Sequence, residues 1–218
     1  MKNKTTKTFI SAIIFITAFI IWTILITTVD VRPVGVNSTN VGLSSVNIWF
    51  HSITGTNMLL YTVTDWLGLV PVFVCMAFGL IGLAQLIKRK SLLKVEPDIV
   101  FLGVYYVIVI MGYVMFEMIP INYRPVLIEG VMESSYPSST TLLVLSVMPT
   151  LIFQLKRKIK NKFTVKSVSV ITVLFSVFMV VGRLVSGVHW LTGIIGSVLL
   201  SAGLFCVYKA VILLTDKS

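Results

Sequence analysis

The sequence predicts an all-α membrane protein with six transmembrane helices, and three observations lead to this fold class. Of the 218 residues, 56% are hydrophobic and only 12% are charged. Six apolar segments are each long enough to cross a bilayer, which takes about 20 residues in a helix. Most of the 18 Lys and Arg residues lie in short clusters between those segments. A soluble domain of this length cannot bury so much apolar surface, so lipid must cover part of it.

The six segments follow one another along the chain. They are expected at about 8–29, 59–87, 99–119, 138–155, 167–188 and 191–214. The first follows three lysines, as the apolar part of a signal peptide does, but it is long enough to span and no small-residue cleavage pattern follows it. We therefore expect a retained helix. The second contains Asp65 and Pro71, and the proline is expected to kink it.

The distribution of positive charge predicts the orientation in the membrane. Apart from three arginines, the Lys and Arg residues form clusters at the N-terminus, at 88–94, at 156–166 and near the C-terminus. Six crossings place all four clusters and both termini on one side, which the positive-inside rule assigns to the cytoplasm. The positive charge is thus explained by anionic lipid rather than nucleic acid. We predict one domain over residues 1–218, integral to the plasma (cytoplasmic) membrane.

Two longer loops are predicted on the extracytoplasmic side. The loop at 30–57 contains an amphipathic stretch at 45–54 that is closed by Gly55. Its Trp49 is typical of a helix lying on the membrane surface. The second loop, 120–137, ends where the fourth membrane segment begins.

The three remaining arginines, Arg32, Arg124 and Arg183, also fall on the extracytoplasmic side, against the charge bias. Arg124 and Arg183 lie where apolar sequence gives way to polar sequence, and a guanidinium there is well suited to hold an anion. Ser138 and Ser139 follow a proline and begin a helix, whose first turn offers unpaired N–H groups. These residues together predict a phosphate-binding site.

His189 adds a nitrogen that can attack phosphorus or transfer a proton. It stands six residues after Arg183, so on one continuous helix the two would be about 600° apart. They can share a ligand only if the helix ends near Gly187, as a glycine allows. The alternative is that His189 simply packs beside Trp190 at the membrane interface.

These residues, in this order, resemble the three-part signature of the type 2 phosphatidic acid phosphatase family, also called the lipid phosphate phosphatase and haloperoxidase superfamily. That signature reads Lys-x6-Arg-Pro, Pro-Ser-Gly-His and Ser-Arg-x5-His-x3-Asp. The matching residues here are Arg124-Pro125, Pro137-Ser138-Ser139-Thr140 and Arg183-x5-His189. The phosphatase-like core is expected at about 99–214.

The resemblance implies roles for five residues. His189 corresponds to the nucleophile, Arg124 and Arg183 to the phosphate clamps, and Ser138 and Ser139 to the backbone cradle. It implies a hydrolase of a lipid phosphate or diphosphate that works through a phosphohistidine. No metal and no other cofactor is predicted.

The sequence departs from the family pattern at positions that carry chemistry. The family lysine, leaving-group histidine and orienting aspartate correspond to Glu117, Thr140 and Gly193, and the serine of the third motif to Gly182. Losing a general acid costs about 10²–10⁴ in rate. Losing a carboxylate that orients a histidine costs about 10⁴ in the serine protease triad. The site is thus expected to be degenerate, and a glutamate in place of the lysine repels an anion.

Three readings of the function remain open at this point. The first is hydrolysis of a lipid phosphate or diphosphate. A diphosphate is the more forgiving substrate, because its leaving group depends less on a general acid. Asp65, Glu129 or Glu133 is a candidate to replace the missing aspartate. The alternative is a non-catalytic relative that binds lipid phosphate or a protein partner. A small transporter using Asp65 and Glu117 is the third, although no broken helices or inverted halves favour it. Glu117 is also expected to pair with Arg124 or Arg183.

Overall fold

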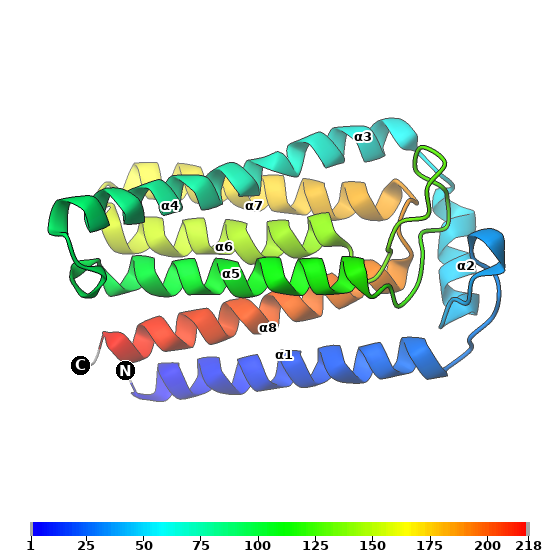
Figure 1. Ribbon diagram of the computed structural model, residues 1–218, viewed down its shortest axis with the longest axis horizontal. Coiled ribbons are helices and arrows are strands. Elements are labelled where there is room, and N and C mark those ends of the chain that lie inside the picture. Colours follow the sequence, from blue (N-terminus) through cyan, green and yellow to red (C-terminus); the bar gives the residue numbers. More distant parts are fainter. Residues whose placement is uncertain (1, 217–218) are drawn as a thin grey trace.

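The computed structural model describes residues 2–216, and over this range the chain forms a bundle of helices (Figure 1). The helices are α1 (Lys2–Thr28), α2 (Ser44–Thr54), α3 (Met58–Leu67), α4 (Leu69–Arg89), α5 (Pro97–Met118), α6 (Ser139–Lys158), α7 (Lys162–Val185) and α8 (Leu191–Thr215), with short 3-10 turns η1 (Val36–Ser38) and η2 (Leu92–Lys94). Within the described range, six segments are long and apolar enough to cross a membrane, with α3 and α4 together counting as one. The predicted fold class is confirmed.

The second membrane segment is divided at Gly68, between α3 and α4. Pro71 explains the division, because it has no N–H to bond to the carbonyl of Leu67 and its ring crowds that turn. Leu67 is the last residue of α3. The expected kink is therefore found, and it separates the short α3, nearer the loops at 29–57 and 119–138, from the longer α4.

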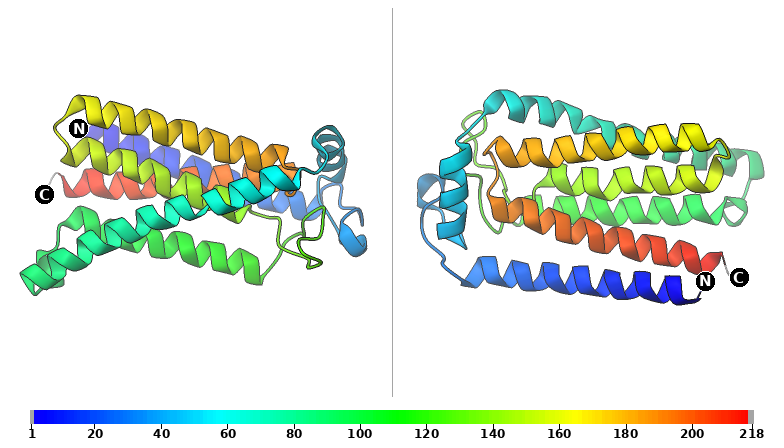
Figure 2. Two further views of the ribbon diagram at one scale, coloured as in Figure 1. Left: turned by 90° about the horizontal axis from the view of Figure 1, so that it is seen from above. Right: turned by 180° about the vertical axis from the view of Figure 1, so that it is seen from behind.

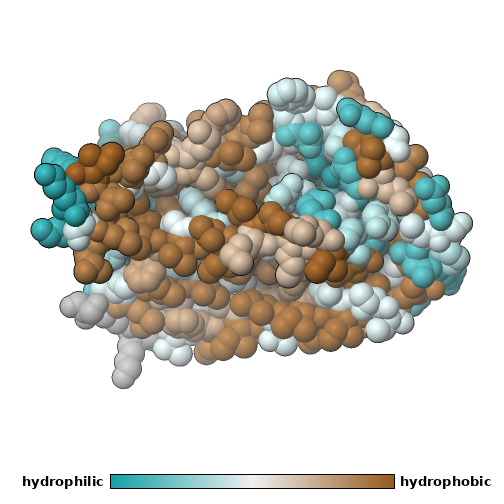
Figure 3. Space-filling model, viewed as in Figure 1, coloured by the Kyte–Doolittle hydropathy of each residue, from teal (hydrophilic) through white to brown (hydrophobic). Residues whose placement is uncertain are grey.

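Both chain termini lie at the same end of the bundle, which we call the termini end (Figure 1). The opposite end, formed by residues 29–57 and 119–138, is called the loop end. On the face seen in Figure 3, hydrophobic residues cover the helices and hydrophilic residues gather toward the two ends. Large apolar side chains such as Ile13 and Ile171 are exposed along the helices, as contact with lipid requires.

Helix α6 occupies the centre of the bundle, where it contacts α4, α5, α7 and α8. Helix α1 packs along α8 (Figures 1 and 2). Gly203 permits this approach, because a Cβ there would lie 2.8 Å from the Ile16 side chain. The core therefore supports α6 and α8 from several sides, and the beginnings of both helices are held in place at the loop end.

The termini end carries the predicted basic clusters together with acidic partners. Arg157 of α6 bonds to Asp98 of α5 at 2.8 Å and to Asp216 at 2.7 Å. Lys158 pairs with Glu96. These ion pairs link α6 to α5 and to the end of α8 at this end of the bundle. Which side of the membrane this end faces stays a prediction.

Helix α2 lies across the loop end (Figure 2) and ends at Gly55, whose φ is 58°. Helix α7 ends at Val185, and Gly187 follows with φ +64°. A Cβ on Gly187 would lie only 1.7 Å from the carbonyl oxygen of Gly55. The predicted interruption at Gly187 is confirmed, and it serves both the turn and the close contact with α2.

Candidate functional site

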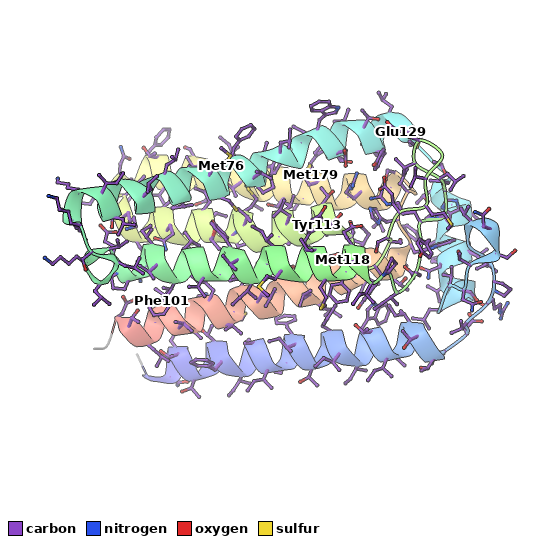
Figure 4. All side chains as sticks on the ribbon, in the orientation of Figure 1. Met76, Phe101, Tyr113, Met118, Glu129 and Met179 are labelled. Atoms are coloured by element: carbon purple, nitrogen blue, oxygen red, sulfur yellow. The ribbon has the colours of Figure 1, made fainter. Side chains whose placement is uncertain are left out.

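A cavity of about 610 Å³ lies near the loop end, bordered by α3, α4, α5, α6 and α7. Apolar side chains form its inner part. Its charged and hydroxyl-bearing residues are Tyr61, Asp65, Tyr113, Glu117, Arg124, Glu133, Ser139, Thr140 and Arg183. Figure 4 shows Tyr113 on the half of α5 that approaches the loop end. The cavity thus combines an apolar part suited to a lipid chain with a polar part that contains two guanidinium groups.

The two arginines converge on one aromatic ring. The guanidinium carbons of Arg124 and Arg183 lie 5.5 and 4.7 Å from the centre of the Tyr61 ring, within the range of a cation–π contact. Arg124 Nη1 also donates to the Tyr61 hydroxyl at 3.2 Å. The expected convergence of the two arginines is therefore found. Tyr61 was not predicted, although its spacing of four from Asp65 places both on one face of a helix.

Arg183 is held in the last turn of α7 and is only 1% exposed. Its Nη2 donates to Thr140 Oγ1 at 2.7 Å and to Asp65 Oδ1 at 3.3 Å. Within residues 2–216, its Nε and Nη1 have no hydrogen-bond partner. Gly182 allows this arrangement, because a Cβ there would lie 2.7 Å from the Thr64 side chain of α3. Two buried donors are thus left available for an anion.

Arg124 is fixed by the loop that carries it. Its Nη2 lies 2.8 Å from Glu133 Oε2, and its Nε donates to the Ser134 carbonyl at 3.2 Å. The expected pairing of Glu117 with an arginine is wrong, because the arginines take Glu133 and Asp65 as partners. Glu133 lies on the same loop as Arg124, and Asp65 lies on α3, which packs against the helix that carries Arg183. Glu117 lines the same cavity as both arginines but forms no ion pair with either of them in the described chain.

The beginning of α6 contributes Ser139 and Thr140 to the cavity, but Ser138 does not line it. Ser138 is fully buried. Its N–H donates to the Gly193 carbonyl at 3.2 Å, and its hydroxyl donates to Thr141 Oγ1 at 3.1 Å. The predicted cradle therefore reduces to the start of α6, where the N–H groups of the first turn have no acceptor inside the helix.

His189 lies between α7 and α8 and is 2% exposed. Its Nδ1 stands 3.2 Å from the carbonyl oxygen of Ser135. A carbonyl can only accept, so Nδ1 carries the hydrogen and Nε2 carries the lone pair. In the described part of the chain, Nε2 is buried and has no partner.

The charges around His189 keep its imidazole neutral. Burial, followed by the positive charges of Arg124 and Arg183, holds the pKa of His189 well below its usual value. The unfolded chain binds a proton near pH 6.5 while the folded chain does not, so this residue lowers stability as the pH falls below about 6.5. At neutral pH the lone pair on Nε2 is therefore available for nucleophilic attack.

None of the three candidate carboxylates bonds to His189 Nδ1 in the described chain. Asp65 pairs with Arg183 and Glu133 pairs with Arg124. Glu129 lies at the tip of the 119–138 loop, with a left-handed φ of 49° and near the beginning of α3 (Figure 4). The question left open by the sequence is thus answered for these three residues, because the partner of Nδ1 is the backbone carbonyl of Ser135.

Comparisons with known proteins bear on the fold. No family model matches the chain, and no curated protein matches it. Among solved structures, the chain is similar to the crystal structure of the first transmembrane PAP2 type phosphatidylglycerolphosphate phosphatase from Bacillus subtilis. The TM-score is 0.65 at 17% sequence identity, over 93% of this chain and 96% of that one. The protein therefore has the fold of a transmembrane PAP2-type phosphatase.

Proposed function

We propose that this protein binds the phosphate of a membrane lipid phosphate or diphosphate in the polar part of the cavity and transfers its phosphoryl group to His189. One observation carries the proposal. Nε2 of His189 and two nitrogens of Arg183, Nε and Nη1, are buried without partners in the described chain. His189 is not among the residues that line the cavity, but the positive charges of Arg124 and Arg183 act on its ring. Buried polar groups are normally paired, and these are the groups that a phosphoryl ligand would satisfy. The PAP2-type fold supports the same function.

In the proposed reaction, the lone pair of His189 Nε2 forms an N–P bond while the bond from phosphorus to the bridging oxygen breaks. The leaving group keeps that electron pair. Water then attacks phosphorus, the N–P bond breaks, and inorganic phosphate leaves. Arg124 and Arg183 bind the non-bridging oxygens and stabilise the charge that develops on them.

The residue at the position of the family acid favours a diphosphate as the substrate. Thr140 stands there, and its hydroxyl accepts a hydrogen bond from Arg183. A threonine hydroxyl is too weak an acid to protonate a leaving group at neutral pH, so the leaving group must depart without a proton from this residue. A phosphate leaving group does so more readily than an alkoxide, and for this reason the lipid diphosphate is the preferred substrate.

The site is proposed to open on the extracytoplasmic side of the plasma (cytoplasmic) membrane. The basic clusters of the chain, including Lys88, Arg89 and the 156–166 segment, belong to the termini end. The positive-inside rule favours that end in the cytoplasm. The cavity would then receive lipids whose phosphate groups lie in the outer leaflet.

The wild-type protein is expected to release phosphate from a long-chain prenyl diphosphate and to release much less from the matching monophosphate. Purified protein in nanodiscs would be mixed with each lipid and inorganic phosphate measured over time. A mock purification from cells lacking the protein serves as the control. Release no greater than this control from both lipids would reject the catalytic proposal.

A second candidate function is binding of the lipid without cleavage. The contact between Thr140 and Arg183 favours this function, because the residue at the position of the family proton donor instead accepts a hydrogen bond from a proposed phosphate-binding arginine. In this case the prenyl diphosphate would bind, and binding would fall in an Arg124→Ala variant, with no phosphate released. Equilibrium binding to nanodiscs containing the lipid distinguishes the two candidates.

Replacing Glu117 by glutamine is expected to tighten binding of the prenyl diphosphate about tenfold. Glu117 lines the same cavity as both arginines, and its carboxylate repels an anionic ligand there. Tenfold corresponds to about 1.4 kcal/mol, which is the interaction of unit charges about 12 Å apart at an effective dielectric constant of about 20. Titration of lipid into nanodiscs measures the change.

The matched control for this change is Glu129→Gln. Glu129 lies in the same loop end but is not among the cavity residues of the described chain, so this variant is expected to bind as the wild type does. Equal affinities for Glu117→Gln and the wild type would show that Glu117 does not oppose the ligand.

A further inference from the structure

We propose that the backbone carbonyl of Ser135 orients His189, in the place where the family signature has an aspartate, and that Gly193 is required because only glycine leaves room for this carbonyl. The inference rests on the proposed function in one respect, since it treats His189 as the nucleophile. It assigns a positioning role to Ser135 and a steric role to Gly193. The chain then keeps the orientation of its histidine although it has lost the carboxylate.

The steric evidence comes from the position of Gly193 in the first turn of α8. A Cβ built on Gly193 would lie 2.3 Å from the carbonyl oxygen of Ser135 and 3.3 Å from its carbonyl carbon. Any side chain at this position, an aspartate included, would have to displace that carbonyl. The same oxygen lies 3.2 Å from Nδ1 of His189. The space that a carboxylate would use is thus occupied by the chain's own backbone.

The carbonyl is held firmly where it stands. Ser135 is fully buried, and its N–H donates to the Asn122 carbonyl at 3.0 Å. Its hydroxyl accepts a hydrogen bond from the backbone N–H of Trp190 at 3.1 Å. Trp190 directly follows His189, so one residue contacts both the ring nitrogen of the histidine and the backbone next to it. An acceptor fixed on both sides fixes the imidazole before a ligand arrives.

A carbonyl and a carboxylate can both orient the histidine, but only the carboxylate adds a negative charge beside it. Both accept from Nδ1–H and so keep the lone pair on Nε2. A carbonyl bears no net charge, so it gives less support to a positively charged imidazole. The charged groups that act on His189 are Arg124, which pairs with Glu133, and Arg183, which pairs with Asp65. The imidazole is therefore expected to be neutral at neutral and mildly acidic pH.

The tautomer of His189 tests the proposal without any enzyme assay. The chain has two histidines, so a His51→Asn variant leaves His189 as the sole source of a ¹⁵N-histidine signal. In nanodiscs at pH 7, the expected spectrum is that of a neutral ring protonated on Nδ1, and it should be unchanged at pH 6. A ring protonated on Nε2, or a charged ring at pH 7, would overturn the proposal.

Variants at position 193 test the steric part. Gly193→Ala and Gly193→Asp should both displace the Ser135 carbonyl, mix the His189 tautomers and lower phosphate release at least about tenfold. Restoring the family aspartate is thus expected to impair the protein. The matched control is Gly112→Ala in α5, where a Cβ meets nothing within 4 Å. Higher release by Gly193→Asp would contradict the proposal.

The two proposals fail in distinguishable ways. A wild-type protein that releases no phosphate but shows the Nδ1–H tautomer would reject the catalytic function and retain the role of Ser135. Phosphate release that depends on His189, found together with an Nε2–H tautomer, would retain the catalytic function and reject the role of Ser135. A Gly193 variant that does not fold leaves the decision to the wild-type and His51→Asn spectra.

Discussion

Replacing His189 by asparagine is expected to reduce phosphate release from a prenyl diphosphate by about 10³-fold or more while lipid binding persists. Asparagine carries an amide nitrogen on Cγ, close to where Nδ1 of the histidine stands, so it can still donate to Ser135. It has no atom at the position of Nε2, which is buried and unpartnered in the described chain. Removing a nucleophile is among the largest losses known for a single residue. Phosphate release and binding to the same nanodiscs provide the two measurements.

The control for this variant is His51→Asn, which changes the other histidine. His51 belongs to α2 and packs against Trp190 at a ring distance of 5.7 Å, so it probes the same region without removing the proposed nucleophile. Its phosphate release is expected to stay within about threefold of the wild type. A His189→Asn protein that retains wild-type release would eliminate His189 as the attacking group.

Replacing Arg183 by alanine is expected to weaken binding of the lipid diphosphate by about 10²-fold or more. Two of its nitrogens, Nε and Nη1, have no partner in the described chain, and a hydrogen bond to a charged group contributes about 1.5–3 kcal/mol. Its partner Asp65 has a side chain that is 54% exposed, so water can solvate the carboxylate left behind. The loss should therefore appear in affinity, measured by titration in nanodiscs, with a smaller effect on folding.

Two further variants separate charge from geometry. Arg183→Lys keeps the positive charge but cannot form the fork of N–H groups, and it should recover only a part of the lost affinity. Arg32→Ala removes another loop-end arginine, which pairs with Asp30 at 2.8 Å and is largely exposed. It should bind as the wild type does. A weakening by Arg32→Ala equal to that of Arg183→Ala would mean that general surface charge, rather than the cavity, attracts the lipid.

The membrane helices could be predicted because lipid imposes strict demands on sequence. Apolar length identified all six crossings, and Pro71 identified the interruption after Leu67. Gly187 indicated the end of α7 because a left-handed backbone there favours glycine. The ends of helices were less accurate: α1 begins at Lys2 and α7 at Lys162, since polar residues extend helices beyond the apolar region.

The site was predicted only in its outline. The two arginines and His189 could be found because their types and spacing resemble a signature. The contribution of Ser135 could not be found, because it comes from a backbone carbonyl that any residue type possesses. The steric reason for Gly193 depends on a contact between segments far apart in sequence. Pairings such as Arg183 with Asp65 likewise depend on how α3 and α7 approach.

The two ion pairs of the cavity have a consequence for how a ligand would exchange. Arg183 with Asp65 and Arg124 with Glu133 give each arginine a counter-ion within the protein. If the proposed phosphate binds here, it competes with these carboxylates for the nitrogens they contact, whereas Nε and Nη1 of Arg183 have no partner to give up in the described chain. The same competition favours departure of a product, because each carboxylate can return to its arginine as the phosphate leaves. Such a site would bind its anion less tightly and release it faster.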